Sequence, residues 1–408
     1  MSVALLARTA RRRRLVGLAG LLVAIGLFAA LGLPRAQATP SAGPTIVSFG
    51  DSIAAGEGSG ADRGYPDNPA AYSAVLAGRL GGTSYNFSIT GACASAGSGA
   101  APGTDSSECR VSKSIITQQI PAARKVGPAT ADVVTITVGA DDIHFSDCFR
   151  ALVFTLGGPP SAGEPDPCAA AQLTTHLRAL STNLATVLST VKTMYPTAKI
   201  AVTGYGNVIP QVVDSRPQSA CSAVNYLYAY ELFKSGGVTA LAKPLITGSF
   251  GKQVGAFQER LYLYAASVLQ QLNTTIQTVA SSHQATYVPV DLTGHDFCQD
   301  YASSTQGWVF APQATGGVSV KWHGIGHSKK FNFQPHTICV PQQPVPACNV
   351  YAPIARSGVK KVTLVKVGPV SAKATVTYDF SAVLNDFPHL TPNGQAAVAG
   401  KIRARLGL

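Results

Sequence analysis

The segment Thr45–Gly58, TIVSFGDSIAAGEG, joins a predicted strand to a predicted turn. Its first five residues are a short run of apolar and β-branched side chains, which is typical of a buried strand. The triplet Gly50-Asp51-Ser52 follows directly. Open parallel sheets bind ligands beyond the carboxyl ends of their strands, so this position predicts that Ser52 lies at a ligand-binding edge. The triplet alone is equally compatible with an ordinary turn.

The rest of the chain continues the pattern of short strands and long helices. Four more strands are expected, at residues 84–87, 132–138, 199–205 and 285–290. Residues 173–191 and 261–279 each keep apolar side chains on one helical face. Strands that alternate with helices indicate an α/β fold in which helices cover both faces of a parallel sheet, joined by right-handed crossovers.

Two segments interrupt this alternation. Residues 225–257 are rich in tyrosine, and residues 300–385 are rich in glycine and proline, with a predicted hairpin at 360–380. We expect both to be insertions in one domain that spans residues 39–408. The tyrosines of the first insertion are expected to pack within it, or alternatively to line an acyl or aromatic pocket; they include Tyr226, Tyr228 and Tyr230.

The composition argues against a nucleic-acid-binding protein. Hydrophobic residues make up 46% of the 408 residues, enough for a packed core, whereas charged residues make up only 13%. The formal net charge is +12, but residues 1–38 supply half of it through six arginines and contain no Lys, Asp or Glu. The remaining +6 is modest, so we expect no nucleic-acid partner.

Residues 1–38 have the three parts of an export signal. Arginines at 8–14 form a cationic start, Leu15 to Leu33 an apolar run, and Ala36-Gln37-Ala38 a small-residue cleavage site. We therefore expect a secreted protein that is cleaved after Ala38. A retained membrane anchor is the alternative, and Arg12-Arg13 leaves both the general and the twin-arginine export routes open.

All eight cysteines lie beyond the leader, an even number that suits an oxidising compartment. None is spaced Cys-x-x-Cys, which argues against zinc ribbons and thioredoxin-like redox chemistry. The count leaves the connectivity open. Joining neighbours in sequence gives the pairs Cys93–Cys109, Cys148–Cys168, Cys221–Cys298 and Cys339–Cys348.

The segment before the last helix supplies the residue types that a serine nucleophile needs. Asp386 lies three residues before His389 in a short loop that contains Pro388. A serine hydroxyl is a poor nucleophile until an imidazole takes its proton, and a carboxylate on the other ring nitrogen orients that imidazole. The alternative is a solvated histidine with an aspartate nearby by coincidence.

Two further blocks follow the second and third strands. Asn86–Ala92 contains Gly91, whose backbone N–H can approach a substrate oxygen, and Val138–Ile143 contains Asp141 and Asp142. Parallel strands end at the same edge of a sheet, so these blocks are expected beside Ser52. Donors aimed at a developing oxyanion are each worth about 3–4 kcal/mol.

In order and in strand context, these four blocks resemble the SGNH, or GDSL, hydrolases, named for Ser, Gly, Asn and His. The resemblance covers residues 45–142 and 386–394 and is strongest to secreted actinobacterial lipases and esterases. It implies Ser52 as nucleophile, Gly91 in the oxyanion hole, and Asp386 with His389 as the other triad members. It also implies a flavodoxin-like three-layer sandwich with five parallel strands in the order 2-1-3-4-5, and no cofactor.

The resemblance also bears on the cysteines. The secreted members have one pair after the second block, one after the third, and a late pair that flanks a Gly-His element. Cys93–Cys109, Cys148–Cys168 and Cys221–Cys298 fit that scheme, with Gly294-His295 just ahead of Cys298.

Asp141 departs from the family pattern, whose third block has an oxyanion-binding Asn at this position. An ionised carboxylate would repel the oxyanion. Our hypothesis is that Asp141 is protonated, because two neighbouring carboxylates resist double ionisation, and donates in place of Asn. It predicts activity that falls as pH rises, and Asp141→Asn keeping activity at high pH. The alternative is a weakened or abolished oxyanion hole.

Other functional motifs are weak or absent. A metal site is the most tempting, but no carboxylate recurs at ligand spacing and Cys339 suits a disulfide better. We therefore expect surface or structural histidines and no metal. The residues concerned are His323, His327, His336 and Cys339. The chain lacks a Gly-x-Ser-x-Gly elbow, a Walker-type loop and a His-Glu-x-x-His motif.

The sequence therefore predicts a secreted serine esterase or lipase whose partners are carboxylic esters, with lipid or short acyl esters ranked first. Removal of acyl groups from a cell-envelope glycan is the enzymatic alternative. A non-catalytic envelope-binding module is the other, suggested by Asp141 and by the 300–385 insertion. Peripheral contact with a membrane or the cell envelope is compatible with each of these.

Overall fold

A computed structural model gives the structure of much of the chain beyond the leader. The described residues are 43–57, 59, 68–96, 109–145, 148, 169–209, 250–296, 308–309, 313–323, 330–333, 359–367, 370–383 and 389–408. The predicted leader at 1–38 and most of the two predicted insertions, including Tyr226, Tyr228 and Tyr230, lie outside them.

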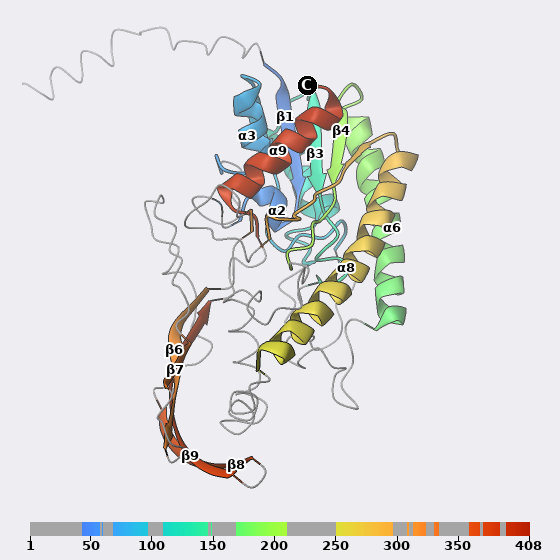
Figure 1. Ribbon diagram of the computed structural model, residues 1–408. Helices are drawn as coiled ribbons and strands as arrows, with labels where there is room; N and C mark the ends of the chain where they lie inside the picture. The colour runs from blue at the N-terminus through green and yellow to red at the C-terminus, as the bar shows by residue number, and fades with distance from the viewer. Residues whose placement is uncertain are drawn as a thin grey trace, which may run out of the picture. The chain divides into compact units, whose positions relative to one another are not determined.

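A five-stranded parallel sheet forms the centre of the fold (Figure 1). Its strands lie in the order β2-β1-β3-β4-β5, as predicted. All four neighbouring pairs are parallel. The strands are β1 (Thr45–Gly50), β2 (Thr83–Asn86), β3 (Val133–Thr137), β4 (Lys199–Thr203) and β5 (Thr286–Val288).

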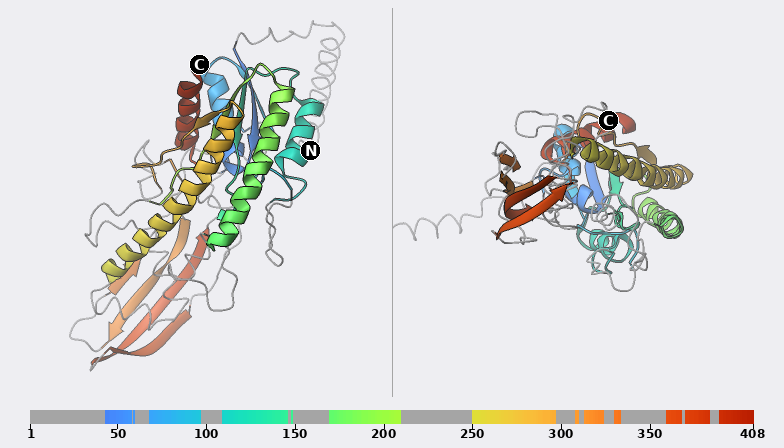
Figure 2. Two further views of the ribbon diagram at one scale, coloured as in Figure 1. Left: turned by 90° about the vertical axis from the view of Figure 1, so that its right-hand side faces the viewer. Right: turned by 60° about the horizontal axis from the view of Figure 1, so that its bottom comes forward.

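Helices cover both faces of this sheet, which confirms the predicted three-layer arrangement (Figure 2). One face carries α3 (Tyr72–Arg79) and the C-terminal α9 (Pro392–Leu406), which lie side by side. The other carries α4 (Ile120–Val126), α6 (Ala170–Met194) and α8 (Phe250–Ser282). The apolar stripes predicted for α6 and α8 are buried in the core and include Leu180, Leu184, Leu188, Leu272 and Ile276.

The burial of the strands explains their order in the sheet. The central strands β1, β3 and β4 are buried along nearly their whole length, and their apolar runs are typical of parallel strands covered on both faces. The short edge strand β2 is more exposed, as its polar sequence TSYN requires. A chain of buried hydroxyls also links the strands, because Thr137 Oγ1 lies 2.8 Å from Tyr72 Oη and 2.5 Å from Thr203 Oγ1.

A second sheet of four antiparallel strands comes from the predicted 300–385 insertion. Its order is β7-β6-β9-β8. The strands β8 (Val359–Val367) and β9 (Val370–Val383) form the predicted hairpin, with Val367 opposite Val370 at the turn. β6 (Gln313–His323) and β7 (Lys330–Phe333) were not predicted. β6 contains Gly316-Gly317, a dipeptide that favours turns, and this obscured its strand pattern.

Two further boundaries concern α8 and the cysteines. α8 begins at Phe250 and therefore takes in the end of the predicted 225–257 insertion. The disulfide Cys93–Cys109 is present, and Cys148 is also disulfide-bonded. Each of the other three predicted pairs includes a cysteine outside the described ranges and stays a prediction. No helix within the described ranges is long and apolar enough to cross a membrane.

Candidate active site

Ser52 begins the four-residue helix α2 (Ser52–Ala55), directly beyond the end of β1. Gly50 has a φ of 142°, and a Cβ atom there would lie 2.1 Å from the Thr137 carbonyl oxygen, so the close approach of β1 to β3 requires glycine. Asp51 caps α2, with its carboxylate accepting a hydrogen bond of 2.9 Å from the Ile53 N–H. Ser52 therefore lies at the carboxyl edge of the sheet, as predicted.

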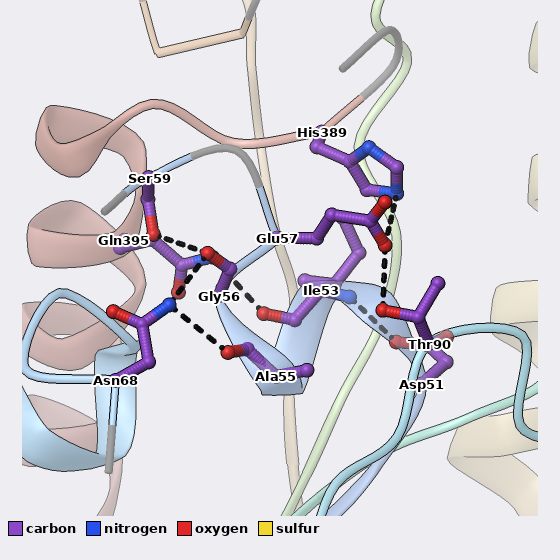
Figure 3. Close-up of polar contacts among 10 residues, drawn as sticks. All are labelled: Asp51, Ile53, Ala55, Gly56, Glu57, Ser59, Asn68, Thr90, His389 and Gln395. Atoms are coloured by element: carbon purple, nitrogen blue, oxygen red, sulfur yellow. Dashed lines mark hydrogen bonds and ion pairs between the residues drawn. The ribbon is translucent and has the colours of Figure 1, made fainter. Parts of the chain in front are cut away.

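Buried side-chain amides hold this turn in place. Gln119 donates to the Gly50 carbonyl and accepts from the Gly50 N–H, both at 2.8 Å. Asn68 donates to the carbonyls of Ala55 and Gly56, at 3.2 and 2.8 Å (Figure 3). These carbonyls end a helix too short to satisfy them internally, so neighbouring segments supply the donors.

A cavity of about 220 Å³ opens at this edge of the sheet, and four of the predicted site residues line it. They are Ser52, Gly91, Asp141 and His389, which come from four separate parts of the chain. Much of the remaining wall is apolar and includes Phe145, Val208, Leu269, Val290, Leu292 and Leu390. Asp386, the fifth predicted residue, lies outside the described residues.

His389 lies directly before a short β-bridge that leads into α9. Its neighbour Leu390 pairs with Val309, and Thr391 caps α9 by accepting a hydrogen bond from the Gly394 N–H. The His389 side chain is 14% exposed, and its Nδ1 atom is buried without a hydrogen bond to any described residue. That ring nitrogen therefore remains available for a carboxylate.

The other ring nitrogen of His389 faces a carboxylate that sequence reasoning missed. The Nε2 atom lies 3.7 Å from Glu57 Oε2 (Figure 3). Thr90 donates a 2.6 Å hydrogen bond to the same oxygen, and the Glu57 N–H donates to the Ser52 carbonyl. Glu57 therefore contacts the turn that carries Ser52 (the serine turn), Thr90 of the Asn86–Ala92 block, and His389. Its signal in the sequence was its position, within the quoted segment and five residues after Ser52.

Tyr205, two residues beyond the end of β4, is the second residue that was missed. Its hydroxyl donates a short hydrogen bond to the Asp51 carboxylate and accepts one of 3.2 Å from the Ala140 N–H. Asn273 of α8 fixes Tyr205 by hydrogen-bonding both its N–H and its carbonyl. Tyr205 thus connects the residue before Ser52 to the residue before Asp141.

Burial is the main cause of the pKa shifts of Asp51 and Tyr205. It raises the pKa of the Asp51 carboxyl from 3.8 to about 7, against the opposing hydrogen bonds from Tyr205 and from backbone N–H groups. Burial, reinforced by the neighbouring Asp51 charge, also raises the pKa of Tyr205 well above its usual value of 10. The turn that carries Ser52 is therefore attached to a carboxyl group that titrates near neutral pH.

Gln395 of α9 connects the segment that carries His389 to the segment that carries Ser52. Its side chain is fully buried, donates to the Ile53 carbonyl at 3.0 Å, and accepts from the Tyr72 N–H at 2.9 Å. Because Ile53 follows Ser52 directly, this one amide ties the start of α9 to the serine turn across more than 300 residues of sequence.

The two aspartates of the third block have different surroundings. The Asp142 carboxylate is buried and accepts two hydrogen bonds from the Ala94 N–H, at 3.2 and 3.1 Å. Asp141 lines the cavity. Of this pair, Asp141 is therefore the residue placed to meet a ligand.

The described residues contain no group of three His, Cys, Asp or Glu side chains that could hold a metal ion. Of the histidines and the cysteine considered for a metal site, only His323 lies within a described element, at the end of β6.

Several solved structures are similar to this chain. They include an extracellular lipase from Streptomyces rimosus, which is 17% identical over 63% of this chain and 85% of its own, with a TM-score of 0.38. A phospholipase A1 from Streptomyces albidoflavus NA297 is 20% identical over 72% of this chain and 93% of its own, with a TM-score of 0.39. A carbohydrate esterase family 2 enzyme from Corynascus thermopiles is 16% identical over 57% and 68%, with a TM-score of 0.26.

The comparison with curated proteins gave no match. The model of the GDSL-like lipase/acylhydrolase family matches residues 48–316, about two thirds of the chain. The matched region contains Ser52, Gly91 and Asp141, and His389 lies beyond it. The observed strand order agrees with the prediction, and the family match confirms the resemblance seen in the sequence. The chain belongs to the GDSL-like lipase/acylhydrolase family.

Proposed function

We propose that the protein is a secreted ester hydrolase in which Ser52, His389 and Asp386 form the catalytic triad. The observation that carries this proposal is the convergence of Ser52, Gly91, Asp141 and His389 on one cavity. These residues lie in four blocks spread over more than 300 positions, and the fold brings them to one sheet edge. Membership of a hydrolase family supports the same chemistry.

The reaction proceeds in two balanced steps. Ser52 Oγ attacks the acyl carbon while its proton passes to His389 Nε2, and collapse of the tetrahedral intermediate breaks the ester C–O bond. The leaving alkoxide takes the proton from His389 and departs as the alcohol. Water then attacks the acyl-enzyme, gives its proton to His389, and the carboxylic acid leaves as Ser52 regains a proton.

Asp386 orients His389 through Nδ1. The buried Nδ1 atom has no hydrogen-bond partner among the described residues, and Asp386 is three residues away in sequence. A carboxylate there keeps the proton on Nδ1, which leaves Nε2 free to accept the proton of Ser52. The backbone N–H groups of Ser52 and Gly91 bind the oxyanion, and Asp141 donates to it when protonated.

The apolar wall of the cavity favours the acyl side of an ester. Phe145, Leu269 and Leu292 are among its lining residues, and burial of an acyl chain against such side chains contributes about 0.8 kcal/mol per methylene. An extracellular location is supported by the arginine-rich, apolar leader and by the Cys93–Cys109 disulfide, since such bonds persist in oxidising compartments.

Hydrolysis of p-nitrophenyl esters from acetate to palmitate tests this function, with the oxidised mature chain beside Ser52→Ala. Turnover that disappears in the variant establishes the serine mechanism, and the preferred chain length separates short acyl esters from lipids. Ser267→Ala, at an exposed position on α8, is the matched control and should keep full activity. A fluorophosphonate probe should label Ser52 in the parent chain alone.

A chain that folds but neither hydrolyses any ester nor reacts with the fluorophosphonate would contradict the proposal. The non-catalytic envelope-binding module would then become the better account of the fold.

A further inference from the structure

Glu57 is a largely buried carboxylate inside the catalytic cavity that the triad mechanism does not use. Its side chain is 14% exposed, and both Glu57 and its partner Thr90 line the cavity. A carboxylate has room for about four hydrogen bonds. Glu57 Oε2 accepts one from Thr90, and Oε1 accepts none from any described residue. Glu57 therefore keeps free acceptor capacity toward a ligand.

The position of Glu57 places its free hydrogen-bond acceptors on the alcohol side of an ester. His389 Nε2 must give its proton to the leaving oxygen, so that oxygen has to come within about 3 Å of Nε2. Glu57 Oε2 lies 3.7 Å from the same nitrogen. A polar group one or two carbons from the leaving oxygen therefore falls within reach of the Glu57 carboxylate.

The charges around the cavity argue against a charged alcohol. The Glu57 carboxylate lines it and disfavours an anion such as a phosphate-bearing head group. Lys113 lines it too and disfavours a cation. Quaternary ammonium ligands are typically bound by cages of aromatic side chains. Besides His389, the described lining residues include only two aromatic side chains, Phe145 and Tyr205, which are too few for such a cage.

With charged alcohols disfavoured, a neutral alcohol with neighbouring hydroxyl groups fits the polar groups of this cavity best. Its O–H groups can donate to the free Glu57 oxygen, and the Thr90 hydroxyl can both donate to and accept from such a group. Resting on the function proposed above, we propose that Glu57 is a specificity-determining residue that selects esters of neutral polyols, such as a glycerol or a sugar, over esters of simple or charged alcohols.

A matched set of esters tests this proposal. The acyl group is the one preferred in the p-nitrophenyl series, and the alcohol is n-propyl, 2,3-dihydroxypropyl, 3-sulfopropyl or 3-(trimethylammonio)propyl. We expect kcat/KM for the dihydroxypropyl ester to exceed that for the propyl ester by about tenfold or more, the effect of a hydrogen bond to a charged acceptor. Both charged esters should be poorer substrates than the dihydroxypropyl ester.

Two variants then connect the preference to Glu57. Glu57→Gln keeps a weaker, neutral acceptor and should reduce the ratio of dihydroxypropyl to propyl kcat/KM to a few-fold. Glu57→Leu removes the acceptor and should bring the ratio near one. Glu259→Gln, the same change on α8 at a residue that does not line the cavity, is the control and should keep the parental ratio. Thermal unfolding of each variant checks that it is folded.

The outcomes separate the inference from the function on which it rests. A parental ratio near one, or a preference for either charged ester, overturns the polyol inference while leaving the ester hydrolase intact. Equal losses toward all four esters in Glu57→Leu overturn it as well, because Glu57 would then act on His389 and not on the alcohol. Turnover that survives Ser52→Ala, or no turnover of any ester, refutes the proposed function itself.

Discussion

Asp141 is the residue at which this chain departs from the family pattern that it otherwise follows. It lines the cavity together with Ser52 and Gly91, where the family has an asparagine amide. A protonated carboxyl can donate to an oxyanion, whereas an ionised one repels it. The activity of the parent chain should therefore depend on the Asp141 proton.

We expect Asp141→Asn to be the more active enzyme at alkaline pH, by tenfold or more in kcat/KM, because an amide donates at every pH. Removing one oxyanion donor typically lowers kcat by a factor of about 100–1,000, so the gain of Asp141→Asn over the parent chain should not exceed that factor. The measurement is the pH–rate profile of both chains on one p-nitrophenyl ester. An Asp141→Asn enzyme with the parental profile and lower activity throughout would exclude a donating Asp141.

Tyr205 influences the pH at which Asp51 loses its proton, and therefore the pH at which the Asp51 carboxylate caps the turn that carries Ser52. The hydroxyl of Tyr205 favours the ionised form of Asp51 and so lowers its pKa, which burial has raised to about 7. Tyr205→Phe removes that bond, so the pKa of Asp51 should rise and less of the carboxylate that caps α2 should remain at pH 7. The other titratable groups that line this cavity are Asp141, Glu57, Lys113 and His389. Tyr72 does not line it, but the Asp51 charge contributes to its raised pKa.

The expected result for Tyr205→Phe is a fall in kcat of about tenfold at pH 7, with partial recovery at pH 9. The acid limb of the kcat profile should move to higher pH. The matched control is Tyr195→Phe, which removes a buried hydroxyl that has no hydrogen-bond partner among the described residues and lies outside the cavity lining. If Tyr205→Phe loses activity equally at every pH, Tyr205 acts through its packing and its hydrogen bond from the Ala140 N–H, and not through the pKa of Asp51.

At the scale of the helices and strands, what the sequence could predict depended on the range of the interactions. The central strands β1, β3 and β4 and the helices α6 and α8 follow from local patterns, because their buried positions recur within a few residues. Glu57 and Tyr205 were missed because their roles come from contacts across 33 and 154 positions. No local spacing marks such contacts. β6 was missed because its two central glycines imitate a turn.

The attachment of α9 to the serine turn rests on one buried amide, that of Gln395. Gln395→Met keeps the shape of the side chain but leaves the Ile53 carbonyl and the Tyr72 N–H without this partner. A buried group that loses its hydrogen bond costs about 1–3 kcal/mol. We therefore expect a loss of about 2–4 kcal/mol in the free energy of unfolding, measured in urea.

The same substitution should also lower kcat by tenfold or more, because His389 lies three residues before the start of α9 and small displacements between reacting groups are costly. Gln270→Met, at an exposed position on α8, is the control and should change stability by no more than about 0.5 kcal/mol. Lost stability with an unaltered kcat would show that Gln395 supports the fold without aligning the triad.

For the whole molecule, burial of Asp51 links stability to pH. The folded chain holds the Asp51 proton more tightly than the unfolded chain, since its pKa rises from 3.8 to about 7. Between these values the folded state binds more protons, so the Asp51 contribution to stability is present below pH 4 and is lost as pH rises to 7. The loss amounts to about 4 kcal/mol, three pKa units at about 1.4 kcal/mol each.

Asp51→Asn should therefore gain stability relative to the parent chain as pH rises from 4 to 8, which urea unfolding across that range measures. Asp291→Asn provides a control of opposite sign. The pKa of the exposed Asp291 is lowered by hydrogen bonds with Thr293, so its stabilising effect is lost as pH falls. A stability difference between parent and Asp51→Asn that stays constant with pH would contradict a raised Asp51 pKa in the folded state.

The second sheet gives the last test of how the chain is organised, since residues 300–385 were predicted to be an insertion in one domain. The ends of that segment are already joined in the core, because Val309 pairs with Leu390 in an antiparallel bridge. Bridged residues in such pairs have Cα atoms about 4.5–5.5 Å apart, a gap that a short linker closes easily. The strands β6 to β9 pair with one another in a sheet of their own.

Replacing residues 310–384 with a four-residue Gly-Ser linker should therefore leave a folded core that hydrolyses p-nitrophenyl acetate at a rate within about threefold of the parent chain. Cys339 and Cys348 leave together, so no predicted disulfide is split, and Asp386 stays in place. Circular dichroism and thermal unfolding report the fold, and the Ser52→Ala version of the shortened chain reports background hydrolysis. A shortened chain that fails to fold would show that the second sheet is part of the core, and one that folds without activity would place part of the active site within residues 310–384.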